Sequence, residues 1–361
     1  MHHETKWSLY YIRLNNILSL YKQTFVTPIT FPPFLRDARI DDFANLLQTL
    51  ENMTLLLRNA IDQEVIDHFQ NFVPITSTPP SSIQDLPERW SNAYAPLADV
   101  SPAIFDSLMD PPTLDEWSST ISSMPNDKAS GPSMISQATV FPIPKPHEWK
   151  CQLKNTRPIT LLEVIRKALV KLFYNRLAPL LASHHVLQGG NFAGLPGGSC
   201  RDPIITLESI IHDSVVTKQP LWILSQDISK AFDSVDLSML RFALQRLRLP
   251  QNAIQFLLSL FMSRSNRVIT AHGPTPPYRV KIGIDQGEVI SPLLWVIYLD
   301  PLLTTLRNEK KDSYCLVSPL APYTTPSISC SLDVLEINNL VFMDDSTLIS
   351  SSKEGMEHMF L

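Results

Sequence analysis

The chain has 361 residues, of which 44% are apolar, and its formal net charge at pH 7 is −5. This composition can supply the cores of two or three domains, so it excludes a disordered chain and favours a soluble globular protein. Residues 289–306 are mostly apolar, but Asp300 and Pro301 interrupt them, so no membrane span and no membrane partner is expected. No signal peptide precedes them, which predicts an intracellular protein, with nucleus or cytoplasm left open.

The four cysteines are far apart in the sequence, and none belongs to a CxxC pair: Cys151, Cys200, Cys315 and Cys330. This spacing predicts neither a zinc site nor a disulfide framework. Four buried, reduced thiols are the simpler expectation.

The charge is unevenly distributed along the chain. Residues 1–140 carry 8 Lys/Arg against 16 Asp/Glu, residues 141–281 carry 18 against 8, and residues 282–361 carry 4 against 11. A basic middle between acidic ends can bind a polyanion, although such runs are more often solvated surfaces.

The first part of the chain is predicted to be helical. Residues 40–72 have apolar side chains at helical spacing, and residues 73–87 are rich in Pro, Ser and Thr, which is typical of a boundary. Residues 138–143 predict a short strand, and residues 161–182 a helix with one apolar side and one basic side. Five of the ten glycines lie between Gly189 and Gly198, which indicates unusual backbone angles, a close approach or simply a surface loop.

The second part alternates strands and helices. Residues 221–228 predict a buried strand, followed by a helix that extends to Leu247. Residues 267–271 and 278–282 predict a hairpin, and residues 288–306 a buried helix with Pro292 in its first turns. Residues 340–342 and 346–349 predict two short strands on either side of a turn.

Three carboxylates are predicted to lie at strand ends. Asp227 ends the apolar segment that starts at Trp222, and Asp344 and Asp345 are at the tip of the last hairpin. Carboxylates in such places are desolvated and repel one another unless a cation joins them. Mg²⁺ prefers oxygen ligands and binds through one or two carboxylates and substrate phosphates. The alternative for each aspartate alone is an ordinary turn residue.

At this point the motifs resemble a known family, the reverse transcriptases of non-LTR (LINE-type) retrotransposons. Seven motifs occur in the order of that family, over about residues 110–350: Asp127-Lys-Ala-Ser-Gly-Pro132, Pro144-Lys145, Arg157-Pro-Ile-Thr-Leu-Leu162, Asn191-Phe-Ala-Gly-Leu-Pro-Gly-Gly-Ser199, Gln226-Asp-Ile-Ser-Lys-Ala-Phe-Asp-Ser-Val235, Gly283-Ile-Asp-Gln-Gly-Glu-Val-Ile-Ser-Pro292 and Phe342-Met-Asp-Asp345. Each motif alone is a weak signal, whereas seven in order are a strong one.

The resemblance implies an α+β fold with the fingers and part of the palm of a right-hand polymerase. The implied parts are a helical N-terminal region over residues 1–110, fingers over residues 111–220 and a palm over residues 221–361. The implied function is RNA-directed DNA polymerase activity, that is, nucleotidyl transfer by two Mg²⁺ ions, with Mn²⁺ as a substitute. The implied partners are an RNA template, a DNA primer and deoxynucleoside triphosphates, whereas protein partners are not indicated.

The resemblance also assigns roles to residues of this sequence. Asp227, Asp344 and Asp345 would be the catalytic, metal-binding carboxylates, with Asp345 the weakest ligand. The nucleotide-binding residues would be Lys145 and Arg157 on the triphosphate, Phe232 as the gate against a ribose 2′-OH, and Gln286 and Gly287 beside the incoming nucleotide. Lys230 and Asp233 would support the turn after the first carboxylate.

Two departures from the family pattern predict weak activity. The link between Ser136 and Gln137 is shorter than in the family, and the sequence ends at Leu361, which predicts that the thumb and primer grip are missing. The alternatives are therefore an inactive fragment that still binds RNA or an RNA–DNA hybrid, and a remnant that binds neither.

Overall fold

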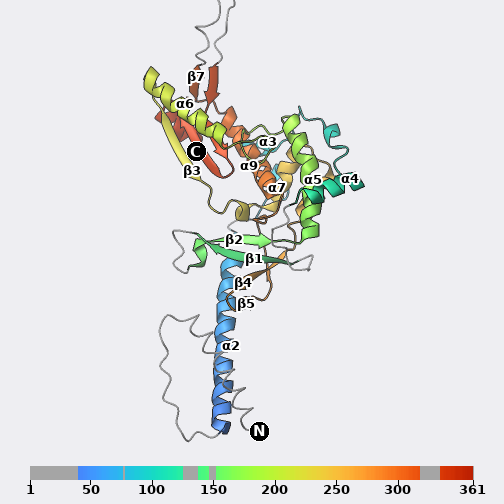
Figure 1. Cartoon of the computed structure of the whole chain (residues 1–361). Helices are drawn as coiled ribbons and strands as arrows, with labels where there is room; N and C mark the ends of the chain where they lie inside the picture. Colours follow the sequence, from blue (N-terminus) through green and yellow to red (C-terminus); the bar gives the residue numbers. More distant parts are fainter. Residues whose placement is uncertain (1–39, 76–77, 125–136, 146–151, 318–333, 361) are drawn as a thin grey trace, which may run out of the picture. The chain divides into compact units, whose positions relative to one another are not determined.

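The computed structural model describes residues 40–75, 78–124, 137–145, 152–317 and 334–360 (Figure 1). The motif at residues 127–132 and the short link at Ser136 lie outside these ranges. Helices and mainly antiparallel strands alternate along the described chain, which confirms the expected α+β class. None of its helices is both long and apolar enough to cross a bilayer.

The chain divides into two compact units. The first comprises Met1–Phe69 and Val268–Pro276, and the second comprises Gln70–Arg267 and Pro277–Leu361. In the first unit, helix α2 (Ile40–Gln70) confirms the predicted N-terminal helix. The tip of the predicted hairpin also belongs to this unit, where Ile269 of β4 pairs with Pro274 of β5.

The rest of that hairpin differs in detail from the expectation. Strand β4 (Ser265–Thr270) is followed by two short strands, β5 (Gly273–Pro274) and β6 (Tyr278–Arg279). Both are antiparallel to β4, and Ser265 pairs with Arg279. The hairpin is therefore present, with its returning arm split at the prolines.

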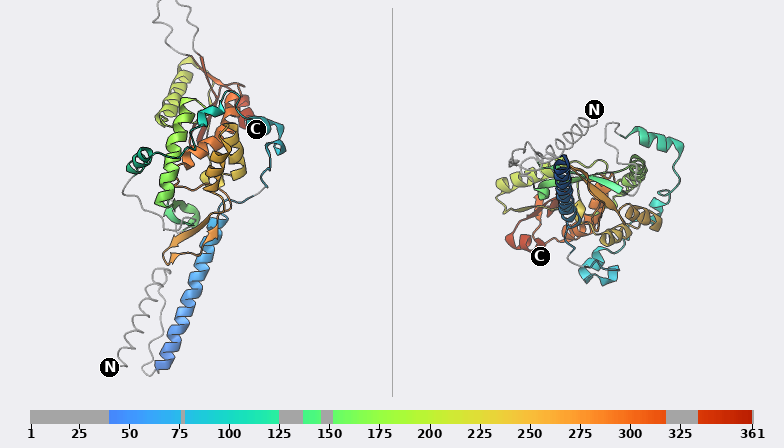
Figure 2. Two further views of the ribbon diagram at one scale, coloured as in Figure 1. Left: turned by 90° about the vertical axis from the view of Figure 1, so that its right-hand side faces the viewer. Right: turned by 90° about the horizontal axis from the view of Figure 1, so that it is seen from below.

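The second unit has a helical core. The main core cluster joins residues of α5 (Val164–Ser183), α7 (Leu237–Arg246), α8 (Gln251–Ser259) and α9 (Ser291–Asn308). Figures 1 and 2 show α5 in green, α7 in gold and α9 in orange. Two shorter helices, α3 (Glu88–Ala93) and α4 (Leu114–Ser122), precede them in the chain. The predicted helix over residues 288–306 is confirmed, with a proline in its first turn.

The predicted helix over residues 161–182 begins later than expected. Leu161 belongs to β2 (Thr156–Leu161), where it pairs with Thr139 of β1 (Gln137–Pro144), so the helix starts at Val164. The apolar side is also only partly buried, because Ile165 is 78% exposed whereas Leu177 is fully buried. Strand pairing decides the boundary here, although the sequence favours a helix throughout.

A three-stranded antiparallel sheet holds the predicted carboxylates. Its strand order is β3 (Trp222–Asp227), β10 (Asp345–Ser350), β9 (Asn339–Phe342). Helices α6 (Arg201–Thr217) and α10 (Lys353–Phe360) contact this sheet, and a two-stranded ribbon, β7 (Tyr314–Val317) with β8 (Val334–Ile337), lies next to α6. The predicted strands around the Met-Asp-Asp turn are therefore confirmed.

Strand β3 forms as predicted, but the expectation that it is buried is wrong. Trp222 is 44% exposed and Ile223 is 42% exposed. Strand β3 is an edge strand of its sheet, and because successive side chains point to opposite faces, both faces are partly open at this end. An apolar run indicates a strand, yet it does not tell whether another layer covers it.

The expectation of buried thiols is also wrong for the two cysteines that the structure describes. Cys200 and Cys315 are both free and exposed. Cys200 precedes the first residue of α6 and Cys315 is on β7, both at the surface. Cys151 and Cys330 lie outside the described residues.

Candidate active site

The turn that ends β9 and begins β10 brings the three aspartates together. Strands β10 and β3 pair antiparallel, with Asp345 directly opposite Asp227. The pairing continues into the turn, because the backbone N–H of Ile228 donates to the carbonyl oxygen of Asp344 over 3.4 Å. The prediction that Asp227 and the Met-Asp-Asp turn lie side by side is confirmed.

Among the described residues, no basic side chain neutralises these carboxylates. Asp227 and Asp345 are exposed and Asp344 is half-buried. Within the described ranges, none of the three forms an ion pair with a Lys or Arg. Burial raises the pKa of Asp344 above its usual range, and the charges of Asp345 and Asp227 raise it further. The site therefore concentrates negative charge that a cation would stabilise.

The donor set fits a hard divalent cation. Carboxylate oxygens are the ligands that Mg²⁺ takes, and it needs only one or two of them when substrate phosphates supply the others. The part of the chain that the structure describes contains no ready-made group of three or more metal-binding side chains.

Two residues without a predicted role contact the Met343 backbone in this turn. The Asn191 side-chain amide donates to the Met343 carbonyl oxygen over 3.1 Å, and its oxygen accepts from the Met343 N–H over 3.2 Å. The Trp295 indole N–H donates to the same carbonyl over 3.1 Å. Asn191 lies in a recognised motif, but no spacing rule connects it or Trp295 with the turn.

The 3₁₀ turn Phe232–Ser234 follows the first carboxylate. Phe232 is half-buried, and its ring lies 6.1 Å from that of Trp295, centroid to centroid. Asp233 accepts a 2.7 Å hydrogen bond from the Gln286 side chain. Burial raises the pKa of Asp233 to about 6, and this hydrogen bond opposes the rise. Lys230 donates to the Phe72 carbonyl oxygen, so both it and Asp233 make contacts within the fold.

Gly287 has a reason within the fold for being glycine. Its φ is +116°, and a Cβ on it would lie 2.7 Å from the Thr160 carbonyl oxygen. The backbone here is already joined to β2, because the Thr160 N–H donates to the Gln286 carbonyl oxygen over 2.9 Å. The close neighbour is thus protein backbone, and contact of Gly287 with a nucleotide stays a prediction.

Lys145 and Arg157 lie at the same end of the β1–β2 hairpin. Arg157 pairs with Ile143 in the ladder, and the Lys145 N–H donates to the Asn155 carbonyl oxygen over 2.9 Å. Arg157 is exposed and Lys145 is half-buried. Neither side chain forms an ion pair within the described residues.

The family model for "Reverse transcriptase (RNA-dependent DNA polymerase)" matches residues 143–360, which is more than half of the chain. The chain belongs to the reverse transcriptase family. Its relatives include the Pol polyprotein of type-1 retrotransposable element R2 from Popillia japonica, 25% identical over 199 residues, which are 55% of this chain and 25% of that protein. The transposon TX1 149 kDa protein from Xenopus laevis is 26% identical over 283 residues, 69% of this chain and 21% of that protein. The predicted resemblance to non-LTR elements is confirmed.

The chain spans about a quarter of the length of these curated relatives. Among solved structures, apo telomerase from Candida tropicalis superimposes with a TM-score of 0.40 at 10% identity, over 72% of this chain and 46% of that one.

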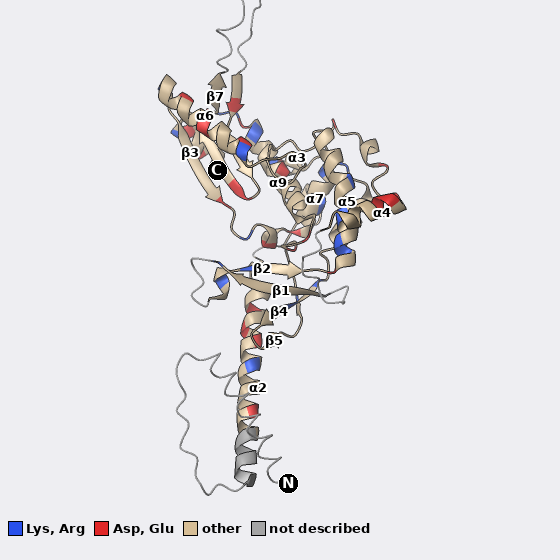
Figure 3. Cartoon of the chain, viewed as in Figure 1, with Lys and Arg blue, Asp and Glu red and all other residues tan. Residues whose placement is uncertain are grey.

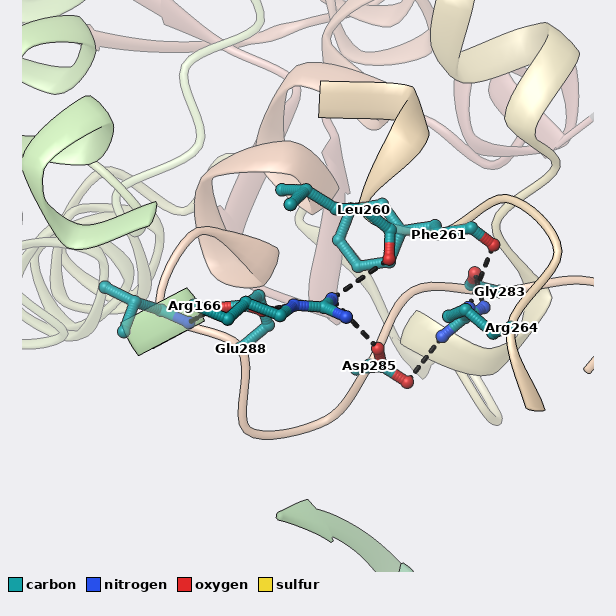
Figure 4. Close-up of polar contacts among 8 residues, drawn as sticks. Arg166, Leu260, Phe261, Arg264, Gly283, Asp285 and Glu288 are labelled. Carbon is teal, nitrogen blue, oxygen red and sulfur yellow. Dashed lines mark hydrogen bonds and ion pairs between the residues drawn. The ribbon is translucent and has the colours of Figure 1, made fainter. Parts of the chain in front are cut away.

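In this reverse transcriptase chain, a buried charged cluster supports the loop at residues 283–288 (Figure 4). Arg264 pairs with Asp285 and donates to the carbonyl oxygens of Gly283 and Phe261. Arg166 pairs with Glu288 at 2.9 Å and with Asp285 at 3.4 Å. Two cations thus balance two buried carboxylates, and these four residues, Arg166, Arg264, Asp285 and Glu288, are called the buried cluster below.

The basic residues of α5 have similar internal contacts. Figure 3 shows Lys and Arg in blue along this helix. Arg166 belongs to the buried cluster, and Arg176 donates to both carboxylate oxygens of Glu116 over 2.6 Å each. Lys171 lies over the Tyr174 ring at 4.8 Å. Several of the basic side chains predicted for this side of the helix therefore contact other residues of the chain.

Proposed function

We propose that this chain carries the nucleotidyl-transfer site of an RNA-directed DNA polymerase, with Asp227, Asp344 and Asp345 as its carboxylates. The observation that carries the proposal is the pairing of Asp345 with Asp227 beside Asp344. Family membership supports it, because the three aspartates lie within residues 143–360 that match the family model.

The reverse transcriptase family is generally dependent on divalent metal ions. We propose that Asp227 and Asp344 hold two Mg²⁺ ions, or Mn²⁺ in their place, with Asp345 as a weaker ligand. When bound, such ions supply the positive charge that activates a primer 3′-OH and stabilises the leaving pyrophosphate oxygens. The aspartates would set the position of the reacting groups, which is the main protein contribution to phosphoryl transfer.

The other predicted residues would select and orient a deoxynucleoside triphosphate. Lys145 and Arg157 have charges available for its phosphates, and Arg157 can form two parallel hydrogen bonds to one phosphate. Phe232 would exclude a ribose 2′-OH, and its packing against Trp295 would keep the ring in place. The Gln286 side chain donates to Asp233 and its carbonyl oxygen accepts from the Thr160 N–H, so Gln286 would act by fixing the position of Gly287 beside the nucleotide.

The template and primer would be an RNA strand and a DNA strand bound by the basic middle of the chain. Residues 141–281 carry 18 Lys/Arg against 8 Asp/Glu. Because Arg166, Arg176, Arg246 and Arg264 are paired internally, we expect fewer phosphate contacts than this excess suggests. Affinity for an RNA–DNA hybrid should fall as salt rises, since each phosphate contact releases counterions.

Primer extension tests the proposal. The purified chain is incubated with an RNA template, an annealed DNA primer and deoxynucleotides, with Mg²⁺, with Mn²⁺ and with a chelator. Metal-dependent extension that Asp227→Asn and Asp344→Asn abolish would support it. The matched control is Asp106→Asn, because Asp106 is an exposed aspartate in a surface turn and should leave extension unchanged.

Two results would contradict parts of the proposal. Extension that survives Asp344→Asn would remove the assigned carboxylate from the mechanism. A second result would favour the inactive binding fragment. In it, the chain extends no primer but binds an RNA–DNA hybrid, and this binding weakens with salt and with Lys145→Ala and Arg157→Ala. For the gate, Phe232→Ala should raise incorporation of ribonucleotides relative to deoxynucleotides, and an unchanged ratio would exclude that role.

A further inference from the structure

The Met343 backbone is in a conformation that an L-residue rarely adopts. Its φ is +56°, in the left-handed region, and it precedes Asp344 directly. For a residue with a Cβ, this region costs about 1–2 kcal/mol, so it persists only where surrounding contacts hold it. The carboxylate next to it therefore depends on whatever holds Met343.

Asn191 contacts both polar groups of that peptide. Its Nδ2 donates to the Met343 carbonyl oxygen over 3.1 Å, and its Oδ1 accepts from the Met343 N–H over 3.2 Å. Oδ1 also accepts from the Ala193 N–H over 3.0 Å, so two N–H donors and one carbonyl fix the orientation of the amide. A carboxylate could reproduce only the accepting half, because an ionised carboxylate has no donor.

The backbone around Asn191 is itself joined to the sheet. The Phe192 N–H donates to the Val341 carbonyl oxygen over 2.9 Å, and Asn191 forms a parallel bridge with Val341. The segment that carries Asn191 is therefore bonded to β9 at Val341, two positions before Met343.

Trp295, which is in helix α9, contacts the same carbonyl oxygen. Its indole N–H donates to the Met343 oxygen over 3.1 Å, and the side chain is 2% exposed in α9. Its ring lies 6.1 Å from Phe232 and 5.9 Å from Tyr298, centroid to centroid. One buried side chain thus contacts both the turn that carries Asp344 and the turn that follows Asp227.

We propose that Asn191 and Trp295 are positioning residues for Asp344, which act by holding Met343 in its left-handed conformation. The inference rests on the proposed function for its effect on the reaction, but not for its effect on the turn. Both side chains would act through the Met343 peptide, which they contact directly. Asp344 would be displaced when either side chain loses its hydrogen bonding to that peptide.

The kinetic consequence should appear in kcat. Misplacement of a reacting group by about 1 Å can cost about 100-fold in rate. We expect Asn191→Ala to lower kcat about 10–100-fold while KM for the deoxynucleotide changes by less than about 3-fold, because the phosphate-binding residues are untouched. Trp295→Phe keeps an aromatic ring but removes the N–H and the volume of the second fused ring. Because it removes one of the three hydrogen bonds to Met343, a smaller loss of kcat is expected.

Two further measurements do not depend on turnover. Hydrogen exchange of the peptide over residues 339–350 should be faster in Asn191→Ala and Asn191→Asp, while exchange over α5 is unchanged. Binding of Mn²⁺ alone, followed by its electron paramagnetic resonance signal, should weaken in Asn191→Ala. Asn191→Asp keeps the accepting oxygen and removes only the Nδ2 donor, so it tests that donor. It also replaces Asn191→Ala in these measurements if the alanine variant does not fold.

The cost of the left-handed conformation at Met343 is tested by combining Asn191→Ala with each of two substitutions at Met343. Met343→Gly removes the Cβ that makes a positive φ costly, whereas Met343→Ala shortens the side chain and keeps that Cβ. Asn191→Ala should increase exchange over residues 339–350 less in the Gly background than in the Ala background. An equal increase in the two backgrounds would overturn the proposal.

The outcomes separate this proposal from the proposed function. If Asp344→Asn abolishes Mn²⁺ binding and extension while the Asn191 and Trp295 variants change neither kcat nor exchange, the function stands and the positioning role falls. If the exchange results agree with the proposal while Asp344→Asn changes neither Mn²⁺ binding nor extension, the turn is held as described and the function assigned to it falls.

Discussion

Two groups of charged residues lie in the second unit, and they differ in where their partners are. The buried cluster joins Asp285 and Glu288 to two arginines inside the fold. The aspartates of the β9–β10 turn and the end of β3 have no such cation among the described residues, and burial and mutual repulsion raise the pKa of Asp344. The two groups therefore predict different effects of substitution: loss of one partner of a buried pair leaves an uncompensated charge in the fold, whereas the proposed role of the turn aspartates predicts loss of activity.

The largest expected effect separates activity from stability at Asp344. Asp344→Asn keeps the shape of the side chain and should abolish primer extension. Its free energy of unfolding at pH 7 should be unchanged or slightly higher, because a raised pKa means that the ionised form is disfavoured in the native state. Extension assays and urea denaturation of the same preparations measure both.

Asp285→Asn is the matched variant for that experiment. It should lower the free energy of unfolding, because Arg166 and Arg264 lose their shared charged partner. Equal losses of stability in the two variants would contradict the contrast between the two groups.

The second prediction concerns the cation of the buried cluster. Arg264→Met keeps much of the side-chain volume and leaves Asp285 without its closest cation, so the free energy of unfolding should fall by about 3–5 kcal/mol. Lys310→Ala is the control, because the Lys310–Glu336 pair is exposed and such pairs contribute about 0–1 kcal/mol. Similar small losses in both variants would show that the cluster is not structural.

The third prediction is a pH dependence at Asp233. Burial raises its pKa to about 6, while an unfolded aspartate titrates near about 3.9. The native state then binds more protons between these values, so this residue lowers stability as pH rises from 4 to 6. Asp233→Asn can still accept from Gln286 and should be more stable than the parent chain at pH 7, by ~1–3 kcal/mol.

The advantage of Asp233→Asn should shrink as the pH is lowered to 4, where the parent side chain is protonated in the native state. Urea denaturation at several pH values measures it. A difference that is constant between pH 4 and pH 8, or a loss of stability at pH 7, would mean that folding does not raise the pKa of Asp233.

The smallest expected effect is at Asp236, a carboxylate whose partners are backbone N–H groups. It caps α7 by accepting from the Ser238 N–H over 2.8 Å and the Met239 N–H over 2.9 Å. Asp236→Ala should cost about 1 kcal/mol, and Asp236→Asn less, since asparagine is an equally good cap. Thermal denaturation that finds the two variants equally destabilised would exclude the capping role.

Local patterns in the sequence determined the elements that carry the site. Alternating and continuous apolar runs predicted the strands around the Met-Asp-Asp turn, and helical spacing predicted α2, α5 and α9. These elements are local, so residues near one another in the sequence suffice to specify them. The motif order predicted the family, and only that resemblance implied that Asp227 lies beside the turn, because the two segments are far apart in the sequence.

The tertiary structure alone decided which charges are paired and what holds the turn. Arg166 and Asp285 are separated by 119 positions, and Asn191 and Met343 by 152, so no local period connects them. The exposure of β3 depends on what packs against the faces of its sheet, and the need for glycine at Gly287 depends on the approach of Thr160. Packing between distant segments sets each of these, because burial and hydrogen-bond partners exist only once the chain has folded.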